Sequence, residues 1–220
     1  MFHHEILDFK DYPATTTSEG RVYHIGDKNY SSVTTFLAAT KDKEGLKGWE
    51  DWCRREGKDP EAIKADAADR GEKLHEICES YIRQDGYEDL RAASSDRIIQ
   101  LFDQLRPKLH RIEKVLALEN VLYSHEMRLA GRVDCVGVIE GVPTIIDFKS
   151  STKLKFGPEV EDYKHQVTVY SMMMYSMFKL SCPNYQIMIA SEVGLPTIVK
   201  GKVKDHYADV MKRIKLFRTK

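Results

Sequence analysis

Residues 131–151, GRVDCVGVIEGVPTIIDFKSS, constrain the fold of this 220-residue chain more than any other stretch. Two β-branched runs flank the turn pair Glu140-Gly141, a pattern that predicts a β-hairpin. Asp134 lies in the first arm, and Asp147 and Lys149 lie in the second. Since side chains alternate between the two faces of a strand, Asp147 and Lys149 share one face. We therefore expect two carboxylates and an amine to converge at this hairpin.

Paired carboxylates can hold a hard divalent cation through oxygen, and a lysine beside the cation can orient or help to deprotonate an attacking water. Phosphodiester hydrolysis uses these groups. However, an Asp-x-Lys pattern also occurs where solvated residues end an ordinary strand, so the pattern alone has little specificity. The surrounding segments must distinguish the two interpretations.

The composition is that of a folded globular protein. Hydrophobic residues make up 42% of the chain and charged residues 31%, which predicts one domain over residues 1–220. The 34 basic residues balance the 34 acidic ones, so the chain has no overall positive field. If it binds nucleic acid, it must use a local groove.

The cysteines and the first residues bear on the cell compartment. Four separate cysteines, with no C-x-x-C pair, predict buried thiols in a reducing compartment. The opening MFHHEILDFKDYP lacks the features of a secretory signal or of a mitochondrial presequence. No apolar run approaches the roughly 20 residues that span a bilayer. These features predict a cytoplasmic protein without a membrane partner.

The amino-terminal part predicts a β element followed by a short helix. Residues 1–30 alternate in short runs and predict a small antiparallel element. Ser31, Ser32 or Thr34 then caps the helix. Exposed N–H groups at a helix start also suit phosphate, which is the alternative role for these hydroxyls.

Residues 45–56 predict an amphipathic helix that carries Trp49 and Trp52. Its hydrophobic residues recur at helical spacing until Gly57, where the helix should end. Core packing is the expected role of the two tryptophans, and stacking on nucleic acid bases is the alternative.

A long helix begins at Asp59-Pro60. Ala67, Gly71, His75 and Glu79 are spaced four residues apart and lie along one side of it. A glycine inside a helix costs about 1 kcal/mol relative to alanine, so Gly71 predicts the close approach of another backbone. His75 becomes a candidate metal ligand if it faces the hairpin, and it is an ordinary helical histidine otherwise.

The segments before the hairpin predict one more helix and two strands. The helix covers residues 96–112 and is expected to kink at Pro107, and the strands cover residues 115–120 and 121–128. Glu119 is an acid within an otherwise apolar strand. It is either a further ligand or supporting base, or simply a charge on an edge strand.

After the hairpin, Lys153 lies in a loop, and a helix follows over residues 159–178. Gln166 and Tyr170 lie one turn apart on this helix and form a polar and aromatic stripe with Tyr163. Two further strands and a last helix are expected to complete the sheet.

Five motifs in this order resemble the PD-(D/E)XK nuclease superfamily, and specifically its RecB-type branch. They are G-x-x-x-H at Gly71 and His75, the acid Glu119, G-R-x-D at residues 131–134, D-x-K at residues 147–149, and Q-x-x-x-Y at Gln166 and Tyr170. Within that branch, the chain resembles the mitochondrial genome maintenance exonucleases and their bacteriophage relatives. This closer resemblance is carried by S-S-V-T-T-F-L at residues 31–37, L-x-x-W at residues 46–49 and A-A-D-R-G-E-K-L-H at residues 67–75.

The resemblance, which covers residues 31–170, implies an α/β fold in which a central mixed β-sheet is flanked by α-helices, with an N-terminal helical segment. From this resemblance together with the patterns at the two ends of the chain, we expect a short β element over residues 1–30, a mainly helical part over residues 31–112 and a nuclease core over residues 113–220. The iron–sulfur cysteines of some RecB-type nucleases are missing, so no iron–sulfur cluster is expected. The missing presequence favours a bacterial or phage member.

Roles for individual residues also follow from the resemblance. His75, Asp134, Asp147 and the main-chain carbonyl of Phe148 would bind Mg²⁺, or Mn²⁺ as a substitute, and Lys149 would position the attacking water. Gln166 and Tyr170 would hold this lysine, the DNA backbone, or both. The residues expected to support the ligands from behind are Glu119 and Glu79. The expected DNA contacts are Arg132, Ser150, Ser151, Lys153 and Thr34.

The function that these features favour is that of a metal-dependent deoxyribonuclease. We expect a single-stranded DNA exonuclease that acts in recombination, repair or genome replication and leaves 5′-phosphates, with protein partners that the sequence does not identify. Two alternatives remain. One is a structure- or sequence-selective endonuclease of the same fold, and the other is a non-catalytic module that binds nucleic acid or protein.

Overall fold

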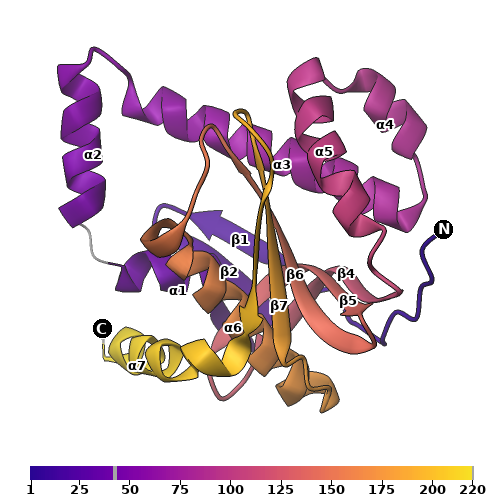
Figure 1. The fold of residues 1–220 in the computed structure, drawn as a ribbon. Helices are drawn as coiled ribbons and strands as arrows, with labels where there is room; N and C mark the ends of the chain where they lie inside the picture. The colour runs from indigo at the N-terminus through magenta and orange to yellow at the C-terminus, as the bar shows by residue number, and fades with distance from the viewer. Residues whose placement is uncertain (42–43, 220) are drawn as a thin grey trace.

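A computed structural model describes residues 1–41 and 44–219, with the side chains of residues 44–46 left out of the description. The Leu46 side chain of the L-x-x-W motif therefore lies outside the described part. Groups of strands are separated by helices along the chain (Figure 1). The strands are β1 (Ala14–Thr17), β2 (Gly20–Ile25), β3 (Lys28–Ser32), β4 (Lys114–Ser124), β5 (Leu129–Ile139), β6 (Val142–Ser151), β7 (Asn184–Ser191) and β8 (Thr197–Lys202).

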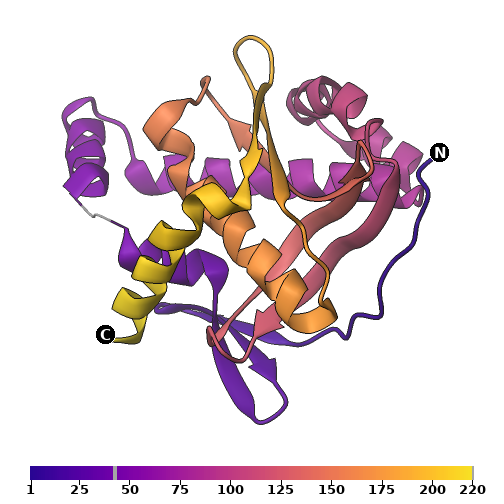
Figure 2. The same cartoon turned by 60° about the horizontal axis from the view of Figure 1, so that its bottom comes forward.

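The helices lie on both faces of the sheet (Figures 1 and 2). They are α1 (Val33–Thr40), α2 (Glu44–Arg55), α3 (Pro60–Arg83), α4 (Tyr87–Ala93), α5 (Asp96–Leu109), α6 (Glu161–Phe178) and α7 (Tyr207–Arg218), with short 3₁₀ helices at Gly157–Val160 and Val203–His206. Among these helices, none combines the length and the apolar character that crossing a bilayer requires.

The eight strands form one mixed sheet. Its order is β1-β2-β3-β5-β6-β7-β8, and β4 pairs with β5 from the other side. The β3–β5 and β6–β7 pairs are parallel and the others are antiparallel. This arrangement confirms the α/β fold with a mixed sheet between helices.

Side-chain alternation along the strands builds a separate apolar core on each face. On one face, Ile145 and Ile187 pack with α1, α6 and α7. On the other face, Ile146 and Met188 pack with α3 and α5. Most of the sheet is therefore covered on both sides, which fixes α3 and α6 on opposite faces of the strands that carry the hairpin motif.

The predicted hairpin is confirmed as β5 and β6. The strands pair from Cys135 with Ile146 to Ile139 with Val142, so the loop has two residues. Its residues Glu140 and Gly141 have φ values of 53° and 71°. Positive φ at both loop residues matches the right-handed twist of the two strands.

One edge of β5 changes partner along its length. β3 pairs with Leu129 and Ala130, and β6 pairs with β5 only from Cys135 onward. Residues 131–134 therefore lie between the two partner strands. Beyond Ile146, β6 continues alongside β7 alone, so the end of the hairpin that carries the charged residues opens away from β5.

The prediction of two strands over residues 115–120 and 121–128 was wrong. A single strand, β4, runs through both segments, and a turn occupies residues 125–128. A register shift between Val115 and Ala117 adds one residue on the β4 side. Such a bulge bends the strand without ending it, and no turn residue in the sequence announces it.

Residues 2–9 do not form a regular strand, although the β element predicted for residues 1–30 is present as β1, β2 and β3. The segment instead follows β4, where Glu5 and Leu7 donate N–H groups to the carbonyls of Val115 and Leu116. One bridge is present in this segment, between His4 and Val115.

The helix predictions hold, apart from the expected kink, one additional helix and the exposure of one tryptophan. Ser32 is the residue that caps α1, since its hydroxyl accepts the Thr35 N–H. Pro107 lies in the last turn of α5, which remains one helix, and α4 was not predicted. Trp52 is 41% exposed, so core packing was wrong for this residue, because α2 packs beside α3 and away from the sheet (Figure 1).

Candidate active site

Asp134 lies where β6 separates from β5. The Phe148 N–H no longer faces a β5 carbonyl there, and it donates to the Asp134 Oδ2 at 2.7 Å instead. A buried backbone N–H without a partner would cost free energy, so the carboxylate stabilises this departure of the strand. The same bond fixes Asp134, which is buried, beside the second arm of the hairpin.

Asp147 is 1% exposed, and its two oxygens differ. The Lys149 amine donates to Oδ1 at 2.6 Å. Among the described residues, Oδ2 is the one buried side-chain oxygen or nitrogen without a hydrogen-bond partner. Burial raises the pKa of Asp147 to about 6, with Lys149 opposing and Asp134 adding to the rise. Buried polar atoms are almost always bonded, and an unpartnered carboxylate oxygen suits a cation ligand.

Lys149 lies on the same face of β6 as Asp147, as the alternation of side chains predicted. Burial lowers the pKa of Lys149, but Asp147 and Asp134 outweigh that effect and raise it. The amine therefore carries its charge at neutral pH. It also lies 5.4 Å from the centre of the Tyr163 ring on α6.

His75 faces the hairpin from α3. Its Nε2 donates to the Phe148 carbonyl at 2.6 Å, and its Nδ1 lies 3.6 Å from the Asp134 Oδ2 and 3.9 Å from the Glu119 Oε1. Burial lowers the pKa of His75, but these carboxylates raise it overall to about 9. The structure thus brings together His75, Asp134 and the Phe148 carbonyl.

Glu119 joins the same group through an unusual backbone conformation. Its φ is 54°, which non-glycine residues rarely adopt, and the Asn120 side chain accepts the Leu118 N–H beside it. Potential ligand atoms of His75, Glu119 and Asp134 lie within 4.8 Å of one another. A strained residue of this kind persists only where its surroundings hold it, and such residues cluster at functional sites.

Gly71 does not have the close backbone neighbour that the sequence predicted. A methyl group on Gly71 would meet the Ser150 Oγ at 3.9 Å, an ordinary contact. A tight glycine beside the hairpin motif is instead Gly131 on β5. A methyl group there would lie 2.9 Å from the Tyr170 Cε1 and 3.1 Å from the Val33 Cγ2.

Gln166 and Tyr170 form a buried wall on the α6 side. The Gln166 Nε2 donates to the Tyr170 Oη at 3.5 Å, and the Tyr170 ring covers Gly131. Burial and the nearby Asp134 keep the pKa of Tyr170 well above its ordinary value. The phenol therefore stays protonated. The hydrogen bond of the Lys149 amine goes to Asp147 rather than to this pair.

The candidate DNA contacts differ in whether their side chains already bond to other parts of the protein. Arg132 donates to the Glu119 carbonyl and to Asp11, and Ser150 accepts from the Arg70 Nε at 3.2 Å. Lys153 is exposed and pairs with Glu159 at 2.7 Å. Thr34 is exposed at the start of α1, where its hydroxyl bonds to the Ser32 hydroxyl.

Ser151 and Glu79 are engaged elsewhere. Ser151 is buried, and its hydroxyl accepts the Lys153 N–H at 3.3 Å. It shapes the loop after β6 and presents almost no surface to a phosphate. Glu79 pairs with Arg83 on the outside of α3, one turn beyond His75, and the structure does not bring it into the group around Asp134.

A charged network that the sequence did not indicate holds α3 beside the hairpin. Arg70 is 5% exposed and contacts Asp66 at 2.9 Å and Glu192 at 3.3 Å. Arg97 on α5 bonds the same two acids, each at 2.6 Å. In the sequence, Arg70 is recognisable only as the residue before Gly71. The type of a charged residue does not indicate whether its side chain is buried.

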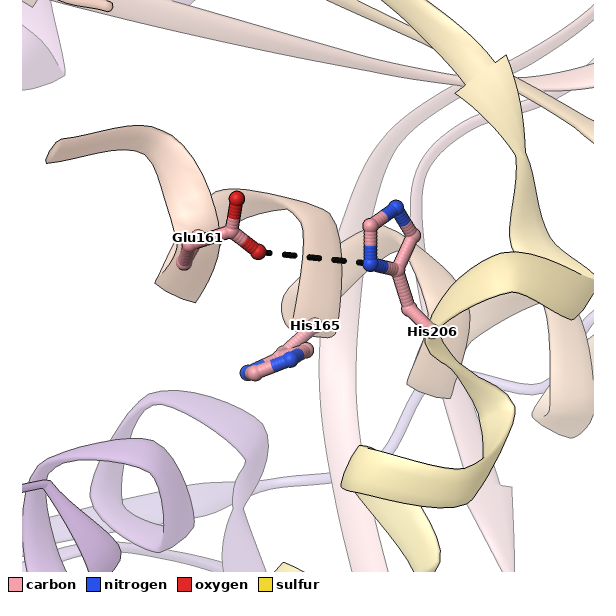
Figure 3. A group of neighbouring side chains, drawn as sticks. All are labelled: Glu161, His165 and His206. Carbon is pink, nitrogen blue, oxygen red and sulfur yellow. Dashed lines mark ion pairs between the residues drawn. The ribbon is translucent and has the colours of Figure 1, made fainter. Parts of the chain in front are cut away.

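A second group of potential ligands lies between α6 and the start of α7. Figure 3 shows Glu161 and His206 facing each other across 4.0 Å, with His165 below them. Protein cations already hold this group, since Lys164 bonds the Glu161 Oε1 at 2.6 Å and Arg213 donates to the His165 Nδ1 at 2.8 Å. The added positive charge disfavours a metal ion, and the group instead ties two helices together.

Comparison with known proteins assigns the chain to a family. The model of the PD-(D/E)XK nuclease superfamily matches residues 50–195, a span that contains His75, the hairpin and the Gln166–Tyr170 pair. The chain belongs to the PD-(D/E)XK nuclease superfamily. Members of this superfamily are hydrolytic nucleases, which generally use divalent metal ions.

Solved structures also match, with 15 chains in total. One is a crystal structure of a "putative exonuclease" from Eubacterium rectale, with 12% sequence identity and a TM-score of 0.44. The match covers 68% of each chain. No curated protein matches significantly.

Proposed function

We propose that this protein is a metal-dependent deoxyribonuclease that degrades single-stranded DNA from an end, with Mg²⁺ as its ion and Mn²⁺ as a substitute. The observation that carries the proposal is the buried, unpartnered Oδ2 of Asp147, which lies on the same carboxylate as the bond to Lys149. One oxygen of this carboxylate accepts the hydrogen bond of the lysine, and the other oxygen is left to bind a cation.

The residues that would hold the ion are His75, Asp134, Asp147 and the carbonyl of Phe148. Three of these four donors are oxygens, which suits a hard divalent cation. Glu119 would support His75, since its Oε1 lies 3.9 Å from the Nδ1 that also faces Asp134. When bound, the ion would neutralise the charge that builds on the phosphoryl oxygens during displacement.

Lys149 would position the attacking water, because Asp147 fixes its amine and the nearby carboxylates keep it charged. Gln166 and Tyr170 are buried, so their amide and protonated phenol would line the site from α6 and offer only a small surface to the DNA backbone. Arg132, Ser150, Lys153 and Thr34 would add phosphate contacts. Ser151 would act only through the loop after β6, where its hydroxyl accepts the Lys153 N–H.

The order of the five motifs supports the RecB-type branch, and a role in recombination, repair or genome replication follows from that likeness. We also propose that residues 1–220 form one nuclease domain, with the β element in residues 1–30, a mainly helical part in residues 31–112 and the core in residues 113–220. The cysteines are separate and buried, in keeping with a protein that carries no iron–sulfur cluster.

Closed circular single-stranded DNA distinguishes an exonuclease from an endonuclease. The purified protein should shorten linear single strands in the presence of Mg²⁺ and leave circles intact over the same time course. Asp134→Asn, which removes a ligand, serves as the control for contaminating nuclease. Cleavage of circles by the wild type but not by this variant would establish the endonuclease alternative.

A further inference from the structure

Four exposed apolar side chains gather on two loops at the carboxyl ends of β6 and β7. They are Leu154 (38% exposed), Phe156 (59%), Val193 (52%) and Leu195 (81%), and we call them the loop-tip patch. The loops touch, since a methyl group on Gly194 would lie 3.7 Å from the Leu154 Cδ2. Both loops rise from the same end of the sheet (Figures 1 and 2). Exposed apolar groups that cluster in this way mark binding surfaces.

A row of positive charge connects the hairpin to the loop-tip patch. The Tyr163 ring lies between two lysines, with the Lys149 Nζ 5.4 Å and the Lys155 Nζ 5.3 Å from its centre. Lys155 also donates to the Tyr163 hydroxyl at 2.8 Å, which fixes its amine beside the ring. Phe156 is the next residue in the chain. Two lysine amines therefore lie beside the Tyr163 ring: that of Lys149, the proposed water-positioning residue, and that of Lys155, which precedes the exposed Phe156.

The acidic residues near the patch are compensated. Glu159 pairs with Lys153 at 2.7 Å, and Glu192 is held by Arg97 and Arg70. Lys155 takes a phenol as its hydrogen-bond partner, so its charge is available to a polyanion. The loop after β6 therefore offers positive charge and an apolar ring together, which complements an unpaired nucleotide better than it complements an apolar protein surface.

We propose that the loop-tip patch is a base-stacking subsite for single-stranded nucleic acid. Phe156 is the stacking platform, and Lys155 and Tyr163 guide the phosphate backbone between this ring and the hairpin. Stacking of bases on aromatic rings is insensitive to sequence, because every base has a π-face. The inference rests on the proposed function, and it adds how the site would bind an unpaired strand.

The test compares binding of two oligomers in EDTA, where cleavage does not interfere. One is a fluorescent oligothymidylate, and the other is an abasic oligomer with the same number of phosphates. Phe156→Leu keeps the apolar volume and removes the ring. It should weaken binding of oligothymidylate by roughly 5-fold or more and leave binding of the abasic oligomer unchanged. Phe156→Trp should bind as the wild type does.

Tyr175→Leu is the matched control, because Tyr175 is also an exposed ring, 58% exposed, but near the other end of α6. It should change neither affinity. The proposal is overturned if Phe156→Leu binds oligothymidylate as tightly as the wild type, or if it loses affinity for both oligomers equally. A loss of self-association by light scattering, with unchanged DNA binding, would show instead that the patch joins two copies of the chain.

Failure of this inference is separable from failure of the proposed function. Cleavage in Mg²⁺ by the wild type and Asp147→Asn tests the function, and binding in EDTA tests the subsite. Loss of cleavage in Asp147→Asn together with normal binding by Phe156→Leu would leave the nuclease in place and remove the subsite. A wild type that binds and cleaves no DNA would remove both.

Discussion

Asp147 is the residue whose surroundings point most directly to a bound cation. Asp147→Asn should lower Mg²⁺-dependent cleavage at least about 100-fold, because it removes a charged ligand from a water-poor site. It should also abolish the heat of Mn²⁺ binding in calorimetry. Glu79→Gln is the control, since Glu79 pairs with Arg83 outside the group around Asp134 and should keep both signals. Unchanged Mn²⁺ binding in Asp147→Asn would contradict the assignment of this ligand.

The two glycines near the site should respond differently to alanine. Gly131→Ala would push a methyl group against the Tyr170 ring, 2.9 Å away, and should destabilise the fold by about 1–3 kcal/mol while slowing cleavage. Gly71→Ala has room, and should stabilise α3 by up to about 1 kcal/mol through helix propensity. Urea unfolding of both variants checks these signs. A destabilised Gly71→Ala would instead support the close backbone contact that the sequence predicted and that the structure does not show.

Residue patterns predicted the hairpin group better than its surroundings. The alternation of Asp147 and Lys149 follows from strand geometry, and His75 was placed beside the hairpin by its motif. The left-handed conformation of Glu119 and the burial of Arg70 were not predictable, because both depend on contacts between segments far apart in the chain. For the same reason, nothing in the sequence distinguishes Ser151, which is buried, from its neighbour Ser150.

At the scale of elements, Arg213 connects three helices on the α6 face. It donates to the Leu37 carbonyl and the Thr40 hydroxyl of α1, and to Asp162 and His165 of α6. Its side chain is 14% exposed. Through these four partners the arginine positions α7 and α1 against the helix that carries Gln166 and Tyr170.

Asp162 gives this junction a pH dependence. Burial raises the pKa of Asp162, but Lys41 and Arg213 outweigh burial and hold it below the ordinary value of 3.8. A lowered pKa in the folded state contributes stability that is complete above the unfolded value and is lost as the pH falls below it. Asp162→Asn should therefore cost about 1–3 kcal/mol at pH 7.

Urea unfolding between pH 7 and pH 3 measures that difference. The gap between the wild type and Asp162→Asn should stay constant down to about pH 4 and shrink below it. A gap that widens towards acid would contradict the sign of the shift.

The predictions of helices and strands were correct where the hydrophobic period in the sequence was long and unbroken. The helices α3 and α5 and the β5–β6 hairpin were found because their apolar spacing and end signals agree. The strand β4 was divided in two at residues 120 and 121, although its ladder with β5 continues there, and α2 was placed in the core because amphipathic spacing does not reveal which surface a helix meets. Tertiary packing decides both.

For the whole molecule, the balance of 34 basic and 34 acidic residues means that electrostatic attraction of DNA must come from a local group of basic residues. Binding to single strands in EDTA should weaken as salt rises. Lys155→Gln should reduce the slope of log affinity against log salt by about 0.7, the value for one phosphate contact to a single strand. Lys114→Gln, whose amine pairs with Glu5, should leave the slope unchanged. A wild-type slope near zero would contradict a phosphate-tracking mode.

Our proposal places the chemistry in the opening beside residues 131–134, within the span that the superfamily model matches. Single-turnover cleavage of end-labelled single-stranded DNA with Mg²⁺ by Lys149→Ala tests that location most directly. The rate should fall at least about 100-fold, with the fold intact by circular dichroism and with Lys114→Ala as active as the wild type. Cleavage by Lys149→Ala at the wild-type rate would contradict the assignment of the hairpin as the active site.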